Sequence, residues 1–551
     1  MFVDSCTTTI NDKVYTRHLL RTTFRKDGKI QHETVANVSR CSDEEIAAMK
    51  LALRHKGNLA ELVSLREDLS LQQGPSVGAV WLLFDLARQL GIAQALGSDR
   101  QGQLALWQVI ARAIDQGSRL SAVRLAGRHA ACDVLDLDAF DEDDLYANLD
   151  WLSEHQAQIE QSLFRRRDDG KAPRLFLYDV TSSYLEGMCN ELGAFGYCRD
   201  GKKGKKQIVI GLLCDEDGLP LSVEVFLGNT GDTIALASAI RQVADRFGGG
   251  EVTFVGDRGA IRSRQIQDLL NRGFHYITAI TKPQIEALLS AGVIQLGLFD
   301  DVVAEVRADD GVRYVLRRNP VRVEEIAASR QDKLLAVQKK VREKNLYLAE
   351  HRRAKVEVAV RTVQRYAEKL KLHGWVQVQA TDRTISLVED PAALAEESKL
   401  DGCYVLKTDL TRQAAGKELV HERYKDLASV EHGFRTCKTG HLEARPIYVR
   451  LESRTRGHVF VVMLAYLLAA ELARRWQGFD VTVQEGIDAL AGICVTQVLI
   501  KGKVQCNQIP QPSESVAPLL EAAQVTLPEV LPSRGVVIAT KKKLPPRRQK
   551  R

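Results

Sequence analysis

Three acidic residues stand where their carboxylates could hold a metal ion. Asp179 follows the apolar run "RLFLY", Asp257 follows "VTFVG", and Glu431 lies in "YKDLASVEHGF". Such a set of carboxylates is the hard oxygen site that Mg²⁺ prefers, with water and phosphate oxygens completing its shell. Two such ions about 4 Å apart can activate an attacking oxygen and stabilise the leaving one in a phosphodiester displacement. The spacing therefore indicates metal-dependent phosphodiester chemistry.

The elements that must bring the first two acids together lie within residues 174–281. Helices are expected at "DTIALASAIRQVADRF" and "SRQIQDLLNRG", and five strands at the apolar runs "RLFLYDV", "QIVIGLLC", "LPLSVEVFLG", "VTFVGD" and "FHYITAI". Three strands, helix, strand, helix, strand is the order of the ribonuclease-H-like fold, in which the first and fourth strands are neighbours. Asp179, at the end of the first strand, and Asp257 would then lie side by side.

The third acid belongs to a segment with helical spacing. Tyr424, Glu431, Arg435 and Lys438 are separated by seven, four and three residues, and such steps fall on one face of an α-helix. Cations beside an acid suit a helix that lies against a nucleic-acid backbone. For the segment taken alone, the alternative is a solvated face of salt bridges.

With 551 residues, the α/β chain is too long for one hydrophobic core. The ribonuclease-H-like core is expected to be interrupted by a mixed α/β insertion and preceded by a mostly helical region. The predicted parts are an N-terminal DNA-binding region with a short hairpin and then helices (1–168), the first part of the core (174–281), the insertion (282–415), the second part of the core (416–480), a C-terminal helical region (481–540) and a basic disordered tail (541–551).

Charge and cysteine usage narrow the class of protein. The tail "KKKLPPRRQKR" is suited to an acidic polymer, although it could also serve only solubility. The ten cysteines form no CxxC pair, which favours a reducing compartment. No signal peptide is evident, and the run "VFVVMLAYLLAA" is too short to span a bilayer. We expect a cytoplasmic protein without a membrane partner.

Several of these stretches together resemble a known family. "YDVTSSYLEG", "FGYCRDGKKGKKQIVIGLL", "GNTGD", "FVGDRGAI" and "YKDLASVEHGFRTCKTGHLEARPIYV" resemble the DDE transposases of bacterial insertion sequences. The group is the one with a β-rich insertion and a Tyr-x2-Arg-x3-Glu-x6-Lys signature. Tyr424, Glu431 and Lys438 fit that spacing, whereas Leu427 stands at the Arg position. Arg435, one turn after the glutamate, would take over the phosphate contact.

The resemblance implies a cut-and-paste transposase at the bacterial nucleoid. It would bind double-stranded DNA, both its terminal inverted repeats and the target, as a homodimer on paired ends. Asp179, Asp257 and Glu431 would be the catalytic residues and would hold two Mg²⁺ ions, which Mn²⁺ can replace. The expected DNA contacts are Tyr424, Arg435, Lys438, Arg258, Lys202, Lys203, Lys205, Lys206, Trp375 and Arg445.

Some of these assignments have structural alternatives. Trp375 could stack on a flipped base, worth roughly 1–3 kcal/mol, but a tryptophan opening a strand is more often a core residue. The lysines of "RDGKKGKK" could hold phosphates or form a plain solvated loop. Asp232 is expected to cap a helix. Two other functions stay open: a ribonuclease-H-like nuclease without strand transfer, and an inactive DNA-binding relic.

Overall fold

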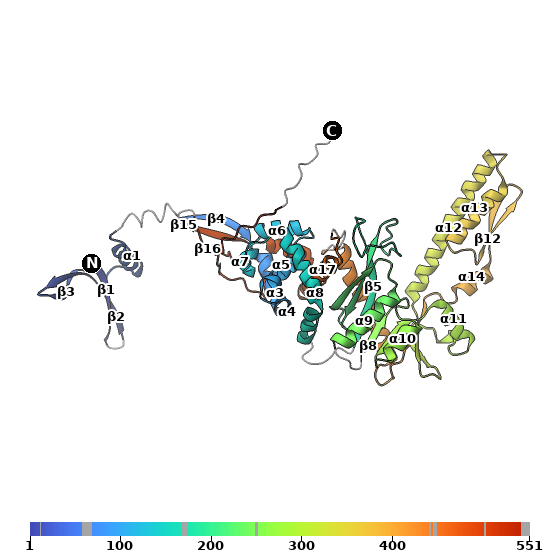
Figure 1. The fold of residues 1–551 in the computed structure, drawn as a ribbon, viewed down its shortest axis with the longest axis horizontal. Helices are drawn as coiled ribbons and strands as arrows, with labels where there is room; N and C mark the ends of the chain where they lie inside the picture. The colour runs from blue at the N-terminus through green and yellow to red at the C-terminus, as the bar shows by residue number, and fades with distance from the viewer. Residues whose placement is uncertain are drawn as a thin grey trace. The chain divides into compact units, whose positions relative to one another are not determined.

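The computed structural model describes residues 1–10, 13–57, 69–167, 175–247, 252–439, 442, 444, 449–500 and 503–541 (Figure 1). The chain divides into two compact units that both draw on distant stretches of sequence. Unit 1 consists of Met1–Leu86, Val123–Asp141 and Arg475–Arg551, and unit 2 of Ala87–Ala122 and Glu142–Arg474. The predicted N-terminal region 1–168 is therefore shared between them.

Unit 1 begins with a small antiparallel sheet of strands β1 (Phe2–Ile10), β2 (Lys13–Lys26) and β3 (Lys29–Asn37). The predicted hairpin is formed by β2 and β3, and the first strand joins it as a third. The hairpin turn has Asp27 and Gly28 at φ values of 53° and 74°, the left-handed conformation that a two-residue turn requires. The helix that follows, α1 (Asp43–Arg54), begins with the predicted capping box of Ser42 and Glu45.

A second sheet in unit 1 combines one strand from the first hundred residues with three strands from the last hundred. Its order is β17-β16-β15-β4, with bounds β4 (Leu69–Ser76), β15 (Cys494–Ile500), β16 (Lys503–Gln508) and β17 (Val530–Leu531). The prediction of a helical region over 481–540 is wrong for β15, β16 and β17. Only α18 (Val483–Ala491) and α19 (Ala517–Ala522) are α-helices among its described residues. Strand β15 pairs with β4, so its conformation depends on a partner more than 400 residues away.

The helical stretch that the sequence predicts follows β4 along the chain. Its helices are α3 (Gly78–Gln89), α4 (Ile92–Leu96), α5 (Arg100–Ile114), α6 (Arg119–Arg128), α7 (Ala131–Leu135) and α8 (Glu142–Arg167). In unit 2, α8 lies against the apolar helix α17 (Glu452–Arg475), where Gly457 faces the Leu149 carbonyl. By length and hydropathy α17 could cross a membrane, but 83% of its most apolar window is buried within the structure. It is the buried core helix that its short apolar run predicts.

Unit 2 is built on a sheet of order β10-β11-β14-β9-β8-β5-β6-β7. The expected core strands are β5 (Leu175–Tyr184), β6 (Gln207–Cys214), β7 (Pro220–Leu227), β8 (Thr253–Gly256) and β9 (His275–Ala279). Strands β5, β8 and β9 run parallel, whereas β6 and β7 are antiparallel to their neighbours. The first and fourth of these strands are neighbours, as the element order predicts.

Side chains alternate across β5 and give its two faces different roles. Phe176, Tyr178 and Val180 enter a hydrophobic core with helices α9 (Asp232–Arg246) and α10 (Ser263–Leu270). Asp179 and Thr181 belong to the alternate set. Thr181 accepts a hydrogen bond from α16 (Leu427–Thr439), which contacts β5. The alternation thus turns the acidic residue of β5 toward α16.

Part of the predicted insertion belongs to the same sheet. Strands β10 (Ala304–Arg307), β11 (Arg313–Arg318) and β14 (Cys403–Thr408) extend it beyond β9, after α11 (Lys282–Ser290) and the short η1 (Leu296–Leu298). The remaining elements are α12 (Pro320–Glu350), α13 (Val356–Lys369), β12 (Val376–Thr381), β13 (Thr384–Glu389) and α14 (Pro391–Ser398). These elements form a hydrophobic core of their own. The central sheet therefore continues past residue 282, the predicted start of the insertion, into strands β10, β11 and β14.

Candidate active site

Asp179 and Asp257 lie at adjacent positions on two parallel strands. The ladder between β5 and β8 ends with the pair Tyr178 and Gly256, and the next residue of each strand is one of the two acids. Strand β5 does not end at Asp179 as predicted, because residues 179–184 remain paired with β6. On the side of β8, however, pairing stops just before the acids. Both are therefore placed at the end of the parallel ladder.

The Asp257 carboxylate is held by its own loop. Its Oδ1 accepts hydrogen bonds from the backbone amides of Gly259 and of Ala260, the latter at 3.0 Å. A Cβ at Gly259 would lie only 2.9 Å from the same oxygen, so a side chain there would crowd the carboxylate. Thr278 donates to the backbone carbonyl of Asp257 at 3.3 Å. The glycine-flanked motif "GDRGA" fixes this acid at the surface, where Asp257 is exposed.

Glu431 completes an electrostatic cluster with the two aspartates. It is exposed on α16. Burial is the largest cause of a rise in the pKa of the Asp179 carboxyl to about 7, and the nearby carboxylates of Asp257 and Glu431 contribute to this rise. The Val180 amide and the Arg199 guanidinium act in the opposite direction. Three acids from distant parts of the sequence thus share one field, which is the situation in which a carboxyl group resists ionisation.

Tyr424 reaches the same cluster from a separate helix. It lies on α15 (Lys417–Lys425), which ends at Asp426 before α16 begins at Leu427. The prediction of one continuous helical face is therefore wrong. Burial raises the pKa of the Tyr424 phenol to about 12, with Asp257 the largest of the contributing charges, and Glu431 and Asp179 acting in the same direction. The phenol therefore stays protonated near neutral pH and can donate a hydrogen bond.

Lys438 lies on the buried side of α16 and not beside Glu431. Leu427, Val430 and Phe434 are buried at helical spacing, and Lys438 follows one turn later with 8% exposure. Its ammonium lies 2.5 Å from Asp200 and 3.1 Å from the Thr181 hydroxyl. In this conformation Lys438 joins the helix to β5 and to the lysine-rich loop.

Arg435 and Arg258 are exposed. The charge of Arg258 favours the ionised form of the Tyr424 phenol, which places this guanidinium near the cluster. Arg435 lies one turn beyond Glu431 on α16. Both guanidinium groups are therefore accessible to a ligand at this end of the sheet, whereas Arg445 lies outside the described residues.

The lysine-rich loop, residues 199–206, contains both paired and exposed cations. Lys205 forms an ion pair with Glu186 at 2.8 Å, and Lys206 donates to the Met188 carbonyl at 3.0 Å. The Lys202 ammonium lies 5.9 Å from the centre of the Tyr184 ring. Lys202 and Lys203 are exposed. These two leave more charge available to a ligand than Lys205 and Lys206 do.

Trp375 is a core residue of the insertion. It is 3% exposed and belongs to a buried cluster with Val337, Val363 and Ile385. Its indole Nε1 has no hydrogen-bond partner among the described residues. This environment agrees with the core alternative, because a base could stack on the ring only after the domain had rearranged.

The carboxylates fit a hard divalent cation in their chemistry. Among the residues that the structure describes, no three His, Cys, Asp or Glu side chains are gathered closely enough to hold a metal ion. Asp257 instead bonds to its own loop. All three acids nevertheless offer carboxylate oxygens, the kind of ligand that a hard divalent cation prefers. The chemistry of these side chains fits a divalent cation, although the described structure does not gather them into a metal site.

Sequence reasoning missed an ion pair beside the cluster. Asp232 does not cap its helix, because the N-cap of α9 is Gly231 and no side chain makes the cap bond. Its carboxylate instead lies 2.6 Å from the Arg199 guanidinium. The two residues are 33 positions apart, and the motifs "GNTGD" and "YCRDG" carry no signal that would pair them.

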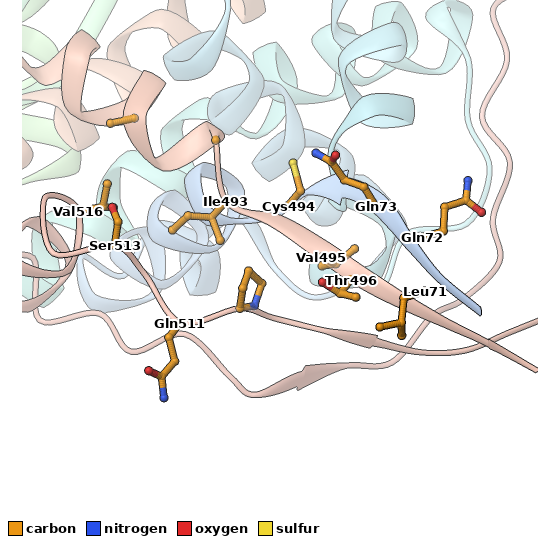
Figure 2. Close-up of a pocket in the computed structure, with 13 residues that line it drawn as sticks. Leu71, Gln72, Gln73, Ile493, Cys494, Val495, Thr496, Gln511, Ser513 and Val516 are labelled. Atoms are coloured by element: carbon orange, nitrogen blue, oxygen red, sulfur yellow. The ribbon is translucent and has the colours of Figure 1, made fainter. Parts of the chain in front are cut away.

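A pocket of about 620 Å³ lies within unit 1, between β4, β15 and the segment near residue 511 (Figure 2). Figure 2 shows glutamines, small polar groups and apolar side chains around it. Its lining consists of Leu71, Gln72, Gln73, Ala489, Gly492, Ile493, Cys494, Val495, Thr496, Pro510, Gln511, Ser513 and Val516. None of these side chains is charged. The pocket therefore lacks the groups that metal-dependent phosphodiester chemistry requires.

Comparison with solved structures gives weak likenesses, among them two transposase complexes. The chain is similar to the piggyBac transposase synaptic complex with hairpin DNA, with a TM-score of 0.35, 8% identity, and coverage of 70% of this chain and 69% of that chain. It is also similar to the Mos1 transposase paired-end complex with left transposon end, with a TM-score of 0.15, 8% identity, and coverage of 29% and 58%. Likenesses with such low TM-scores carry no argument about the fold, which is inferred from the strand order of the sheet.

Comparison with protein families is decisive. The family model "Transposase DDE domain" matches residues 170–468. The model "IS1634 family transposase, N-terminal domain" matches residues 5–63. No curated protein sequence matches the chain. Because the first model spans more than half of the residues and includes all three acids of the cluster, this chain belongs to the DDE transposases of insertion sequences.

Proposed function

We propose that this chain is a cut-and-paste transposase that cleaves DNA at the ends of its element and joins those ends to a target. The observation that carries the proposal is the convergence of Asp179, Asp257 and Glu431. Two of these acids follow the last residue pair of a parallel strand ladder, and the third shares their electrostatic field. The three residues would be the catalytic carboxylates.

A ribonuclease-H-like core is the fold that we assign to unit 2. The strand order β7-β6-β5-β8-β9, with antiparallel β6 and β7 and parallel β5, β8 and β9, supports this assignment. The helices α9 and α10 pack on the strands between which they occur. In such a core the first and fourth strands are neighbours, as β5 and β8 are here, and Asp179 and Asp257 follow the last residue pair between them.

In the proposed cleavage, a water oxygen forms a bond to phosphorus and the bond to the 3′ oxygen breaks, so that this oxygen leaves with a proton. In strand transfer, the freed 3′-hydroxyl attacks a phosphorus of the target DNA and displaces its 3′ oxygen. Asp179, Asp257 and Glu431 would hold two Mg²⁺ ions, which Mn²⁺ can replace and which supply Lewis-acid activation when bound. The protonated phenol of Tyr424 would donate a hydrogen bond to a phosphate oxygen.

Double-stranded DNA is the proposed partner, both as terminal inverted repeats and as target. The exposed cations Arg258, Lys202, Lys203 and Arg435 would contact its phosphates. Pairing of two ends would use a homodimer at the bacterial nucleoid. Lys438 would join these contacts only if its ion pair with Asp200 opened, and Trp375 would not contribute in its buried position.

The test is cleavage of DNA that carries the terminal repeats of the element, with Mg²⁺ and a separate target duplex. We expect end-specific nicking and joining by the wild type. The Asp179→Ala and Glu431→Ala variants should retain end binding but lose cleavage, because each lacks one carboxylate. Asp309→Asn, a change of an exposed acid in the turn after β10, serves as the matched control.

Other outcomes would support other functions. Nicking without joining to the target would favour a nuclease without strand transfer. End binding by the wild type with no cleavage in Mg²⁺ or Mn²⁺ would favour an inactive relic, for which Leu427 at the signature arginine position would offer a reason.

A further inference from the structure

The dipeptide Arg199–Asp200 connects elements that carry the active-site acids. The Arg199 amide donates to the Ser182 hydroxyl at 3.0 Å, three residues after Asp179 on β5. The Asp200 carboxylate lies 2.5 Å from the Lys438 ammonium of α16, the helix of Glu431. These contacts attach the dipeptide to the part of β5 that extends beyond the end of β8. The start of the lysine-rich loop is therefore fixed beside the carboxylate cluster.

The Arg199 side chain is held at one nitrogen only. Its Nη2 lies 2.6 Å from Asp232, the first residue of α9, and the arginine side chain keeps 28% exposure. Within the described part of the chain, Nε and Nη1 make no hydrogen bond. A guanidinium offers five N–H donors in a planar fork, so most of these donors face solvent or a ligand.

Asp232 also places the guanidinium near the second acid. A Cβ at Gly259 would lie 3.4 Å from Asp232 Oδ2 and 2.9 Å from Asp257 Oδ1. The Asp232 carboxylate is thus close to the loop of Asp257. The field of Arg199 also reaches the first acid, because the guanidinium opposes the rise in the pKa of Asp179. The arginine is therefore within electrostatic reach of Asp179, and its partner Asp232 lies close to the Asp257 loop.

Because Asp232 is only partly buried, this ion pair contributes little to stability by itself. A partly exposed guanidinium that is within electrostatic reach of Asp179, and whose Nε and Nη1 make no hydrogen bond among the described residues, is well suited to bind a phosphodiester. Arginine binds phosphate through paired N–H groups, and a fixed neighbouring carboxylate sets the orientation of the fork.

We propose that Arg199 is a phosphate-binding residue of the active site and that Asp232 is its positioning residue. Arg199 contacts the DNA phosphate that lies at the carboxylate cluster, and Asp232 holds the guanidinium toward it. This inference rests on the proposed transposase function. The arginine would supply cationic contact at the site where Lys438 is buried and Leu427 replaces the signature arginine.

The experiment measures the affinity of the full-length chain for the terminal-repeat duplex over a range of salt concentrations. Each phosphate contact contributes about 0.9 to the slope of log affinity against log salt. We expect Arg199→Ala to lower this slope by about one and to weaken binding about tenfold or more. Arg241→Ala, an exposed arginine nine residues after Asp232 on α9, is the matched control and should leave the slope unchanged.

Duplexes with a single neutral methylphosphonate locate the contact. At one position next to the cleaved bond, the wild type should lose as much affinity as Arg199→Ala loses on the native duplex. At that same position the variant should lose nothing further. Asp232→Asn should raise KM for the duplex with a smaller change in kcat and should leave the salt slope nearly intact, because the charge of Arg199 remains.

Two results would overturn the inference while leaving the transposase proposal in place. One is wild-type cleavage together with an unchanged salt slope in Arg199→Ala. The other is an equal loss for Arg199→Ala on every methylphosphonate duplex. If Arg199→Ala fails to fold, Arg199→Gln replaces it in the same measurements. Absence of wild-type cleavage would refute the proposed function, and the salt slope would still report on the phosphate contact.

Discussion

Replacing Asp179 by asparagine should stabilise the metal-free protein while abolishing cleavage. The amide retains the size of the carboxyl group and an oxygen that can accept from the Val180 amide. It removes the charge that burial and the acids Asp257 and Glu431 disfavour. Active sites commonly hold such unfavourable charge, and neutralising it trades activity for stability.

The size of the effect follows from the pKa of Asp179, which rises from its usual 3.8 to about 7 in the folded chain. A carboxyl with a raised pKa costs nothing below the unfolded value, and its cost grows until the pH passes the folded value. At pH 8 the full displacement corresponds to roughly 4 kcal/mol, and at pH 5 to roughly 2 kcal/mol. Asp179→Asn should gain up to these amounts, and more at pH 8 than at pH 5.

Urea-induced unfolding in a chelating buffer, followed by tryptophan fluorescence, measures this gain. Asp309→Asn should leave the free energy of unfolding unchanged at both pH values. Added Mg²⁺ should stabilise the wild type but not Asp179→Asn, because the ion needs the carboxylate. An Asp179→Asn variant that is no more stable than wild type at pH 8 would refute the inference that burial and acidic neighbours make the ionised Asp179 carboxylate unfavourable in the folded chain.

Two further changes test the packing of unit 2. Gly457→Ala should destabilise the chain by roughly 1–3 kcal/mol, because its Cβ would lie 2.1 Å from the Leu149 carbonyl oxygen. Gly187→Ala is the control, since a Cβ there meets nothing within 4 Å. Equal melting temperatures of the two variants would contradict the close contact between the helices. Burial raises the pKa of Glu160 to about 7 although Arg246 lies 2.8 Å away. Ionised Glu160 should therefore cost up to roughly 3 kcal/mol as the pH rises from 4.5 to 7, and Glu160→Gln should remove that part of the pH dependence of the melting temperature.

Local signals in the sequence predict much of the core. Apolar runs of strand length, interrupted by amphipathic helices, indicate β5 to β9 in the observed order. The capping box at Ser42 and the turn at Asp27–Gly28 predict the N-terminal hairpin and helix for the same reason, since both are formed by residues within a few positions of each other. Such features depend on local backbone geometry, which adjacent residues are sufficient to set.

The helix break before Leu427 shows where spacing alone was insufficient. The steps from Tyr424 to Lys438 fit one helical face, but the chain ends α15 at Asp426 and starts a new helix. Lys438 is the next buried position on α16 after Val430 and Phe434. The Asp200 carboxylate balances its charge there, and the Thr181 hydroxyl accepts a hydrogen bond from it. No spacing rule shows this, because the partners come from a loop and a strand more than 200 residues earlier.

The sequence by itself determined which acids are candidates for the site, because strand and helix periodicity indicate that Asp179 and Asp257 follow apolar strand segments and that Glu431 lies on a helix. Only the tertiary structure decided which cations lie beside them. Arg199 forms an ion pair with Asp232, whereas the buried Lys438 forms one with Asp200. The strands β4 and β15 likewise pair with each other although they come from distant parts of the chain. Long-range pairing depends on the positions of both partners in the folded chain, and local sequence carries no record of those positions.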